Sequence, residues 1–156
     1  MARARDHLAR ALTAWLAVCA ATGTANAGAQ TFGNRGSALR VTEPSVRVAV
    51  GTPSIGAGYM TLTNAGSARV VIRAFECLNV RSVRLHLSTE QGGVMRMAPL
   101  DSIEIAPHGS ATLRPGAAHL MLEGPHRPFR AGTLLTCTLH AAGGGAVTWL
   151  APVRAP

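Results

Sequence analysis

The sequence contains no lysine, few acids and few aromatic residues. All 15 of its basic residues are arginines, only seven residues are acidic, and aromatic residues make up 4%. Nucleic-acid-binding proteins usually gather cations on one face and add aromatic platforms, whereas these arginines are spread singly along the chain. The chain also lacks a G-x-S-x-G motif and offers few general acids. These absences predict neither a nucleic-acid-binding protein nor an enzyme.

Cysteine is scarce as well. The chain has three, of which Cys77 and Cys137 lie beyond the N-terminal segment. These two either form one disulfide, as exported proteins often do, or are two separately buried thiols. Neither has a second Cys or His at a spacing typical of a zinc site, so a thiolate metal centre is not expected.

The sequence has no apolar run long enough to cross a membrane. The longest run, "ALTAWLAVCAA" at 11–21, follows Arg3, Arg5 and Arg10 and precedes "ANA" at 25–27. A basic start, a short apolar run and small residues in that order are typical of a secretory signal peptide. We therefore expect residues 1–27 to be removed after Ala27, leaving a periplasmic protein without a membrane span.

Cys19 allows a second interpretation of the same segment, as the anchor of a lipoprotein. This interpretation is weaker, because Val18 is bulky where a small residue is expected before the cysteine. After cleavage at Ala27 the chain keeps 12 arginines and 6 acids, a charge of about +6. Such a basic surface is attracted to acidic partners or anionic lipid.

The rest of the chain indicates one all-β domain. Residues 28–40 are rich in Gly, Asn and Ser and predict a flexible lead-in, and residues 41–156 form the domain. Within the domain, short apolar or alternating runs such as "SVRVAV", "RSVRLHL" and "AVTWLAPV" are separated by turn formers such as "GTPSIGAG". No helix-length apolar stripe is present, so the pattern predicts an antiparallel Greek-key sandwich or barrel.

Two of the predicted strands place a histidine on the face away from the core. In "AHLMLEG", Leu120 and Leu122 share the core face, and His119 and Met121 share the other. In "SVRLHLS", the same alternation turns His86 away from the leucines. We expect this opposite face to meet water, where a methionine beside an imidazole is unusual.

Methionine is concentrated between these two histidines. Met95 and Met97 lie two apart in "GGVMRMAP", while Met60 in "GYMTL" is expected to fill the core. Thioether sulfur is a soft ligand that prefers Cu(I), and imidazole suits copper and zinc. A His and Met set without thiolate or paired carboxylates therefore predicts a Cu(I) site on the protein surface.

The spacing H-x10-M-x21-H-x-M resembles the signature of the periplasmic copper chaperones called PCu(A)C. "GAGYMTLTNAG", "GVMRMAPL" and "IEIAPHGSATLRPGAAHLMLEG" extend the resemblance over about residues 41–153. It implies a cupredoxin-like β-barrel that binds one Cu(I), with ligand roles for four residues: His86, Met97, His119 and Met121. Met95 would be auxiliary.

The resemblance also implies delivery of copper to the CuA centre of cytochrome c oxidase subunit II, directly or with a Sco-type thiol protein. Two departures from the family pattern matter. Many members have a further methionine where this chain has Ser88, so a backup thioether is missing. The chain also ends at "LAPVRAP" without a tail rich in His and Met, which puts a second, Cu(II) site in doubt.

Three other functions remain open at this point. A cupredoxin that transfers electrons needs a cysteine thiolate beside two histidines, and neither Cys77 nor Cys137 has the required spacing. A copper storage or detoxification protein would use the same ligands. A β-sandwich interaction module without metal would not need Met97 or Met121.

Overall fold

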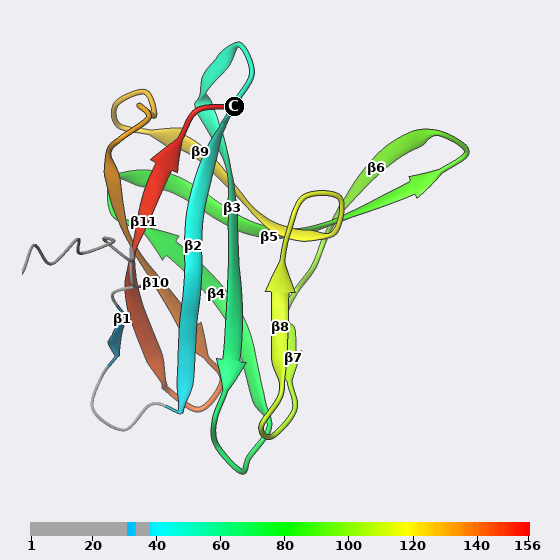
Figure 1. Cartoon of the computed structure of the whole chain (residues 1–156), viewed down its shortest axis with the longest axis vertical. Coiled ribbons are helices and arrows are strands. Elements are labelled where there is room, and N and C mark those ends of the chain that lie inside the picture. The colour runs from blue at the N-terminus through cyan, green and yellow to red at the C-terminus, as the bar shows by residue number, and fades with distance from the viewer. Residues whose placement is uncertain (1–30, 34–37) are drawn as a thin grey trace, which may run out of the picture.

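In the computed structural model of the protein, residues 31–33 and 38–156 are described, and their regular structure is entirely β (Figure 1). The predicted all-β architecture is confirmed. The strands are β1 (Thr31–Gly33), β2 (Leu39–Ala49), β3 (Thr52–Asn64), β4 (Val70–Cys77), β5 (Val80–Gln91), β6 (Val94–Pro99), β7 (Ile103–Ile105), β8 (Ser110–Leu113), β9 (Ala118–Pro125), β10 (Leu134–Ala141) and β11 (Ala146–Arg154).

The strands are hydrogen-bonded in the order β6-β5-β9-β3-β2-β11-β10-β4-β7, with β1 beside β11 and β8 beside β3. Neighbouring strands are antiparallel except β11 and β2, which are parallel at Val153 and Val46. Figure 1 shows β5 and β9 crossing one end of the longer strands, and the β5–β6 hairpin projecting from the body. None of the described residues forms a helix that could span a membrane.

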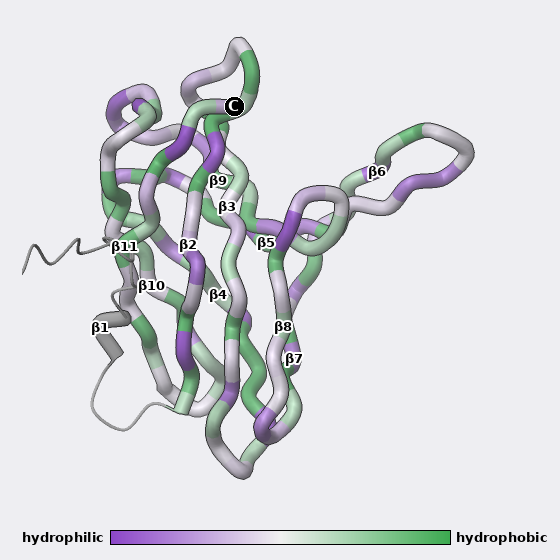
Figure 2. Tube along the Cα trace, viewed as in Figure 1, coloured by the Kyte–Doolittle hydropathy of each residue, from purple (hydrophilic) through white to green (hydrophobic). Residues whose placement is uncertain are grey.

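A hydrophobic core fills the space between the strands. Its largest fully buried side chain is Trp149 of β11, and Leu62 and Ile72 are completely buried beside it in the same cluster. Figure 2 shows hydrophobic and hydrophilic residues alternating along the long strands, as expected when one face packs inward. Met60 is 4% exposed, which confirms its predicted role as a core residue.

The segment "GTPSIGAG" differs from the prediction, because most of it is strand rather than turn. The chain reverses at Val50 and Gly51, and β3 already begins at Thr52. Gly56 and Gly58 serve close packing instead. A Cβ on Gly56 would lie 3.0 Å from Val46, and one on Gly58 would lie 3.1 Å from Leu120. Glycine there lets neighbouring side chains approach the backbone.

The predicted lead-in at 28–40 also contains paired backbone. Residues 31–33 form β1 against β11, and β2 begins at Leu39. A three-residue strand needs only backbone donors and acceptors, so the sequence shows no hydrophobic periodicity from which it could be predicted.

Cys77 and Cys137 form a disulfide, which decides between the two alternatives left by the sequence. They lie directly opposite each other on β4 and β10, and both are buried. The bridge joins strands 60 residues apart in the chain. In the chain-entropy model, a loop of that length restricts the unfolded state by roughly 4 kcal/mol.

We predict that the double substitution Cys77→Ala and Cys137→Ala lowers the free energy of unfolding by roughly 4 kcal/mol. Urea denaturation of the oxidised protein, the reduced protein and the variant measures this loss. Reduced wild type should resemble the variant, since both lack the covalent loop. A variant as stable as the oxidised protein would contradict this account of the bridge.

Candidate metal centre

His86 and His119 lie directly opposite each other on β5 and β9. Side chains paired in this way project from the same face of a sheet, with Cβ atoms about 4.5–5.5 Å apart. The two imidazole rings are 6.0 Å apart between centroids and stand at 84° to each other. The core residues Leu85 and Leu120 occupy the adjacent positions on these strands and point to the opposite face. The predicted separation of histidines from leucines is therefore confirmed.

Both imidazoles can offer a nitrogen lone pair. The Nδ1 atom of His119 is 3.1 Å from the carbonyl oxygen of Ala117, which only accepts hydrogen bonds, so Nδ1 carries the proton in this contact. A neutral His119 then keeps a lone pair on Nε2. On His86, Nδ1 is buried and has no hydrogen-bond partner among the described residues. Buried polar atoms are rarely left so, and a bound metal ion would satisfy this one.

The burial of His119 differs from the prediction of a face open to water. Its side chain is only 6% exposed, whereas His86 is partly exposed. The backbone carbonyl of Ala117, just before β9, lies against this imidazole and contacts its Nδ1. Alternation along a strand assigns a face but does not reveal what covers it, so the sequence could not predict this burial.

Met121 occupies the next outward position on β9 after His119. Its neighbour across β5 is Arg84, and across β3 it is Ala57, which in turn pairs with Arg47 on β2. This row of outward residues therefore places an arginine on each side of Met121. Glu123, one outward position further along β9, is the acid nearest to Met121 on that strand.

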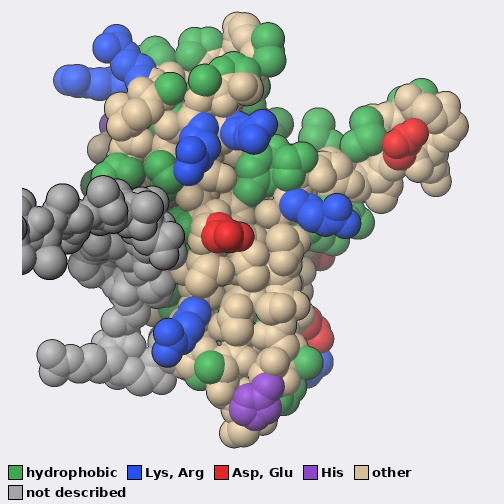
Figure 3. Space-filling view, viewed as in Figure 1, with side chains coloured by type: hydrophobic (Ala, Val, Ile, Leu, Met, Phe, Trp, Pro, Cys, Tyr) green, Lys and Arg blue, Asp and Glu red, His purple; other side chains and the backbone are tan. Residues whose placement is uncertain are grey.

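Met97 lies on the β5–β6 hairpin, opposite Ser88. It shares the outward face with His86, two positions away on β5, and its side chain is 60% exposed. Met95 also points outward and is 53% exposed. Gly92 and Gly93 make the turn, both with positive φ angles, as two-residue hairpin turns require. Figure 3 shows hydrophobic side chains along this projecting arm.

The four predicted ligands share one face, but the register does not bring all four together. Met97 is level with Ser88 and Met121 is level with Arg84, so the two methionines lie on opposite sides of the histidine pair along the strands. Four residues along a strand span about 13 Å. Met121 is therefore a neighbour of both histidines, whereas Met97 is a neighbour of His86 alone. Met97 would approach Met121 if the hairpin curled over His86.

Sequence reasoning missed Tyr59. It lies on β3 one position beyond Gly58, the last β3 residue paired with β9, and is therefore level with His119. Tyr59 is partly buried, and this burial raises the pKa of its phenol above 10.0, an effect that the positive charge of Arg47 partly offsets. Because Met60 was predicted to point into the core, strand alternation could have predicted that its neighbour Tyr59 points to the opposite face, the one that carries the histidines.

No three His, Cys, Asp or Glu side chains gather at one point in the described part of the chain. The fold and the site thus define a single-domain β protein with two imidazoles and nearby thioethers on the outer face of its sheet.

The chain belongs to the LpqE-like family, described as "Putative lipoprotein LpqE-like", whose sequence model matches residues 39–153. It is also similar to "Putative lipoprotein Lxx21020" of Leifsonia xyli subsp. xyli. The two sequences are 28% identical over 152 residues, which cover 95% of this chain and 90% of the relative.

Solved structures give the same fold. The copper-bound PCuAC domain from PmoF2 matches with a TM-score of 0.63 and 22% identity over 77% of this chain and 95% of that domain. Apo-DR1885 from Deinococcus radiodurans has a TM-score of 0.60 and 25% identity over 99% and 95% of the two chains. Its CuI form has a TM-score of 0.54 and 31% identity over 77% and 82%. The predicted cupredoxin-like Greek-key fold is thereby confirmed.

We predict that Tyr59, the single tyrosine of the chain, ionises at higher pH in the folded protein than in the unfolded chain. The unfolded chain then loses this proton first as the pH rises. The contribution to stability is present below about pH 10 and is lost as the pH rises through the folded pKa. Phenolate absorbance during an alkaline titration, with and without urea, measures both values.

The variant Arg47→Gln serves as the control for this titration. Removing the cation should raise the folded pKa further, because the charge of Arg47 favours the phenolate. A folded midpoint at or below that of the unfolded chain would show that the phenol of Tyr59 is not buried in the folded protein.

Proposed function

We propose that this protein is an exported Cu(I)-binding metallochaperone. The observation that carries the proposal is the direct pairing of His86 with His119, with Met121 beside them and Met97 on the adjoining hairpin. The comparisons support it, since the similar PCuAC domain from PmoF2 is copper-bound and DR1885 has a CuI form.

The donor chemistry favours a monovalent ion. Two imidazoles and two thioethers are neutral ligands, and the soft sulfur atoms prefer Cu(I) to harder divalent ions. Arg84 and Arg47 flank Met121 in the same outward row, so they add positive charge near the site. Repulsion from fixed cations grows with the charge of the bound ion, which disfavours Cu(II) and Zn(II) relative to Cu(I).

The hairpin suggests how the ion is taken up and released. His86, His119 and Met121 form the fixed part of the site on β5 and β9. Met97 completes it when the hairpin curls inward. All residues from 89 to 99 are exposed, so no packed layer opposes this bending. Met97 is then the last ligand to bind and the first to leave, which opens one position to a ligand of the recipient.

A thiolate-bearing protein fits as the recipient, because an anionic sulfur ligand competes well against a neutral thioether. We propose a Sco-type thiol protein or the CuA centre of cytochrome c oxidase subunit II. Copper storage or detoxification would use the same ligands and differ only in the absence of transfer. Metal-free interaction would not satisfy the buried Nδ1 of His86, which has no hydrogen-bond partner among the residues that the structure describes.

We predict that His86→Ala and His119→Ala each weaken Cu(I) binding at least about tenfold, since losing even a group that only orients a ligand costs 10–100-fold. Met121→Leu should also weaken binding. Met97→Leu should have the smaller effect on affinity and mainly speed release. Anaerobic titration against a competing Cu(I) chelator gives the affinities, and stopped-flow transfer to the chelator gives the release rates.

Two matched variants control for the change of residue type. Met60→Leu replaces a core methionine, and His108→Asn replaces an exposed histidine whose φ of 55° asparagine tolerates. Both should bind Cu(I) like wild type. Equal affinity in every variant would remove the proposed site.

We propose export to the periplasm with cleavage after Ala27, a segment outside the described residues. The relatives named as lipoproteins favour a second possibility, lipid attachment at Cys19. The mass of the exported protein distinguishes the two. A chain that begins at residue 28 is expected, and a diacylglycerol-modified chain that begins at Cys19 would establish the lipoprotein instead.

A further inference from the structure

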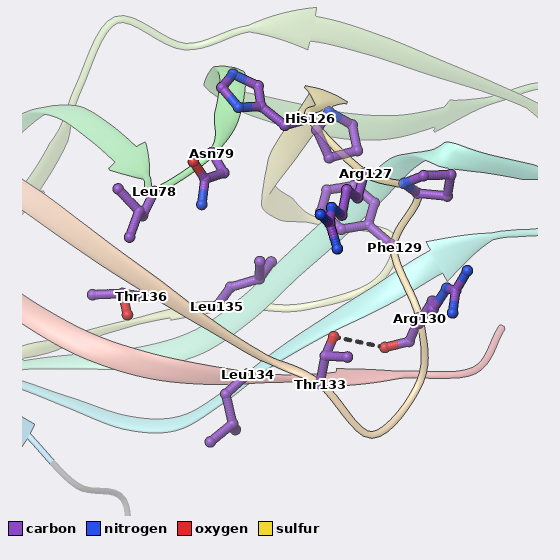
Figure 4. Close-up of a pocket in the computed structure, with 12 residues that line it drawn as sticks. Leu78, Asn79, His126, Arg127, Phe129, Arg130, Thr133, Leu134, Leu135 and Thr136 are labelled. Carbon is purple, nitrogen blue, oxygen red and sulfur yellow. Dashed lines mark hydrogen bonds between the residues drawn. The ribbon is translucent and has the colours of Figure 1, made fainter.

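A hollow of about 760 Å³ lies at the end of β5 that is remote from the histidine pair. It is bounded by the turn between β4 and β5, the loop between β9 and β10, and the start of β10 (Figure 4). Its rim begins near Val80, which pairs with Pro125, and His86 lies six residues further along β5. That separation is about 20 Å, so the hollow is distinct from the proposed metal site.

The loop between β9 and β10 is held firmly in place. Phe129 is 6% exposed, and its backbone N–H donates to the carbonyl of Pro53 at 2.8 Å. The N–H of His126 donates to the carbonyl of Asn79 at 2.8 Å. The hydroxyl of Thr133 donates to the carbonyl of Arg130 at 2.7 Å, drawn as a dashed line in Figure 4. The side chains of this loop are therefore presented from a fixed backbone.

The hollow combines cationic and apolar side chains. Arg127, Arg130 and His126 line it, and no acid does so among the described residues. Leu78 and Leu134 line it as well and are 66% and 61% exposed. Figure 4 shows Leu78 and Arg130 on opposite sides of the opening. Two large exposed aliphatic side chains at the rim of one hollow can contact an apolar layer together.

The two acids closest in sequence to the lining residues, Glu76 and Glu123, do not line the hollow and do not pair with these cations. Glu76 lines the neighbouring hollow, beside Leu78, and its carboxylate lies 3.0 Å from Nε2 of His140. Arg127 and Arg130 take part in no ion pair in the described part of the chain. Two uncompensated guanidinium groups attract an anion, and a phosphodiester matches their paired N–H donors.

We propose that this hollow binds the headgroup of an anionic phospholipid and docks the protein on a membrane surface. Arg127 and Arg130 bind the phosphate, while Leu78 and Leu134 enter the boundary between headgroups and acyl chains. A bilayer supplies both the anion and the apolar layer that these residues need. Free phosphate would leave the leucines in water, and a carboxylate-rich protein surface would place polar groups against them.

This docking would leave the metal site free. The histidine pair lies about 20 Å along β5 from the hollow, so Cu(I) exchange would continue while the protein is membrane-bound. The inference does not depend on copper and survives if the metal proposal fails.

The test is co-sedimentation of the exported protein with vesicles at 0.15 M ionic strength, where the Debye length is about 8 Å. The protein is produced from a precursor with Cys19→Ala, which excludes a lipid anchor at that residue. We expect binding to phosphatidylcholine mixed with phosphatidylglycerol and none to phosphatidylcholine alone. Arg127→Gln with Arg130→Gln should weaken binding about thirtyfold. Each arginine near an anionic surface contributes about 1 kcal/mol, and about 1.4 kcal/mol corresponds to a tenfold change in affinity.

Leu78→Ser with Leu134→Ser tests the apolar contribution and should also weaken binding, without loss of folding, because both side chains are exposed. Arg40→Gln with Arg73→Gln is the matched control. It removes the same charge from exposed positions outside the hollow and should bind the vesicles like wild type.

Three outcomes would overturn the proposal. One is the absence of binding to the anionic vesicles. Another is equal weakening by the control pair, which would show only diffuse attraction. The third is displacement from vesicles by millimolar inorganic phosphate, or binding to polyglutamate in place of vesicles, either of which would assign the hollow to another ligand.

Discussion

The pairing of His86 with His119 across β5 and β9 is the contact on which the proposed metal site depends. It brings two nitrogen donors to one point and sets Met121 beside them. A shift of the register by one residue would turn one of the histidines toward the core, because side chains alternate between faces. The position of the two imidazoles in the proposed site therefore depends more on the register of β5 and β9 than on the conformation of any loop.

The hydrophobic core holds that register. Leu85, Leu120 and Leu122 are buried on the inner face of the same two strands, so a slip would expose them to water at about 1.5–3 kcal/mol each. Gly56 and Gly58 on β3 leave room for neighbouring core side chains to pack tightly. Residues with no metal chemistry thus determine where the imidazoles lie.

The β5–β6 hairpin, in contrast, is not held in place by the hydrophobic core. Its residues pair only with each other beyond Ser88, and Met95 and Met97 remain exposed although burial would stabilise the protein. An exposed two-stranded ribbon gains little from packing and bends at small cost. The proposed carrier therefore joins a histidine pair fixed by the core to a thioether on an arm that can approach or withdraw. Such a combination suits an ion that must be held and then given away.

Alternation and turn residues in the sequence were enough to predict the all-β fold and the strands β2, β5, β9 and β11. They also placed His86, His119 and Met121 on the face away from the leucines, because strand periodicity is a local property. They failed at "GTPSIGAG", where the glycines are needed because side chains from other strands pack against them. They also failed at β1, because backbone pairing leaves no side-chain pattern in the sequence. Only the tertiary structure decided the disulfide, the burial of His119, the position of Tyr59 and the separation of Met97 from Met121. Each of these depends on which distant segments meet, and a pattern along one strand carries no information about its partner.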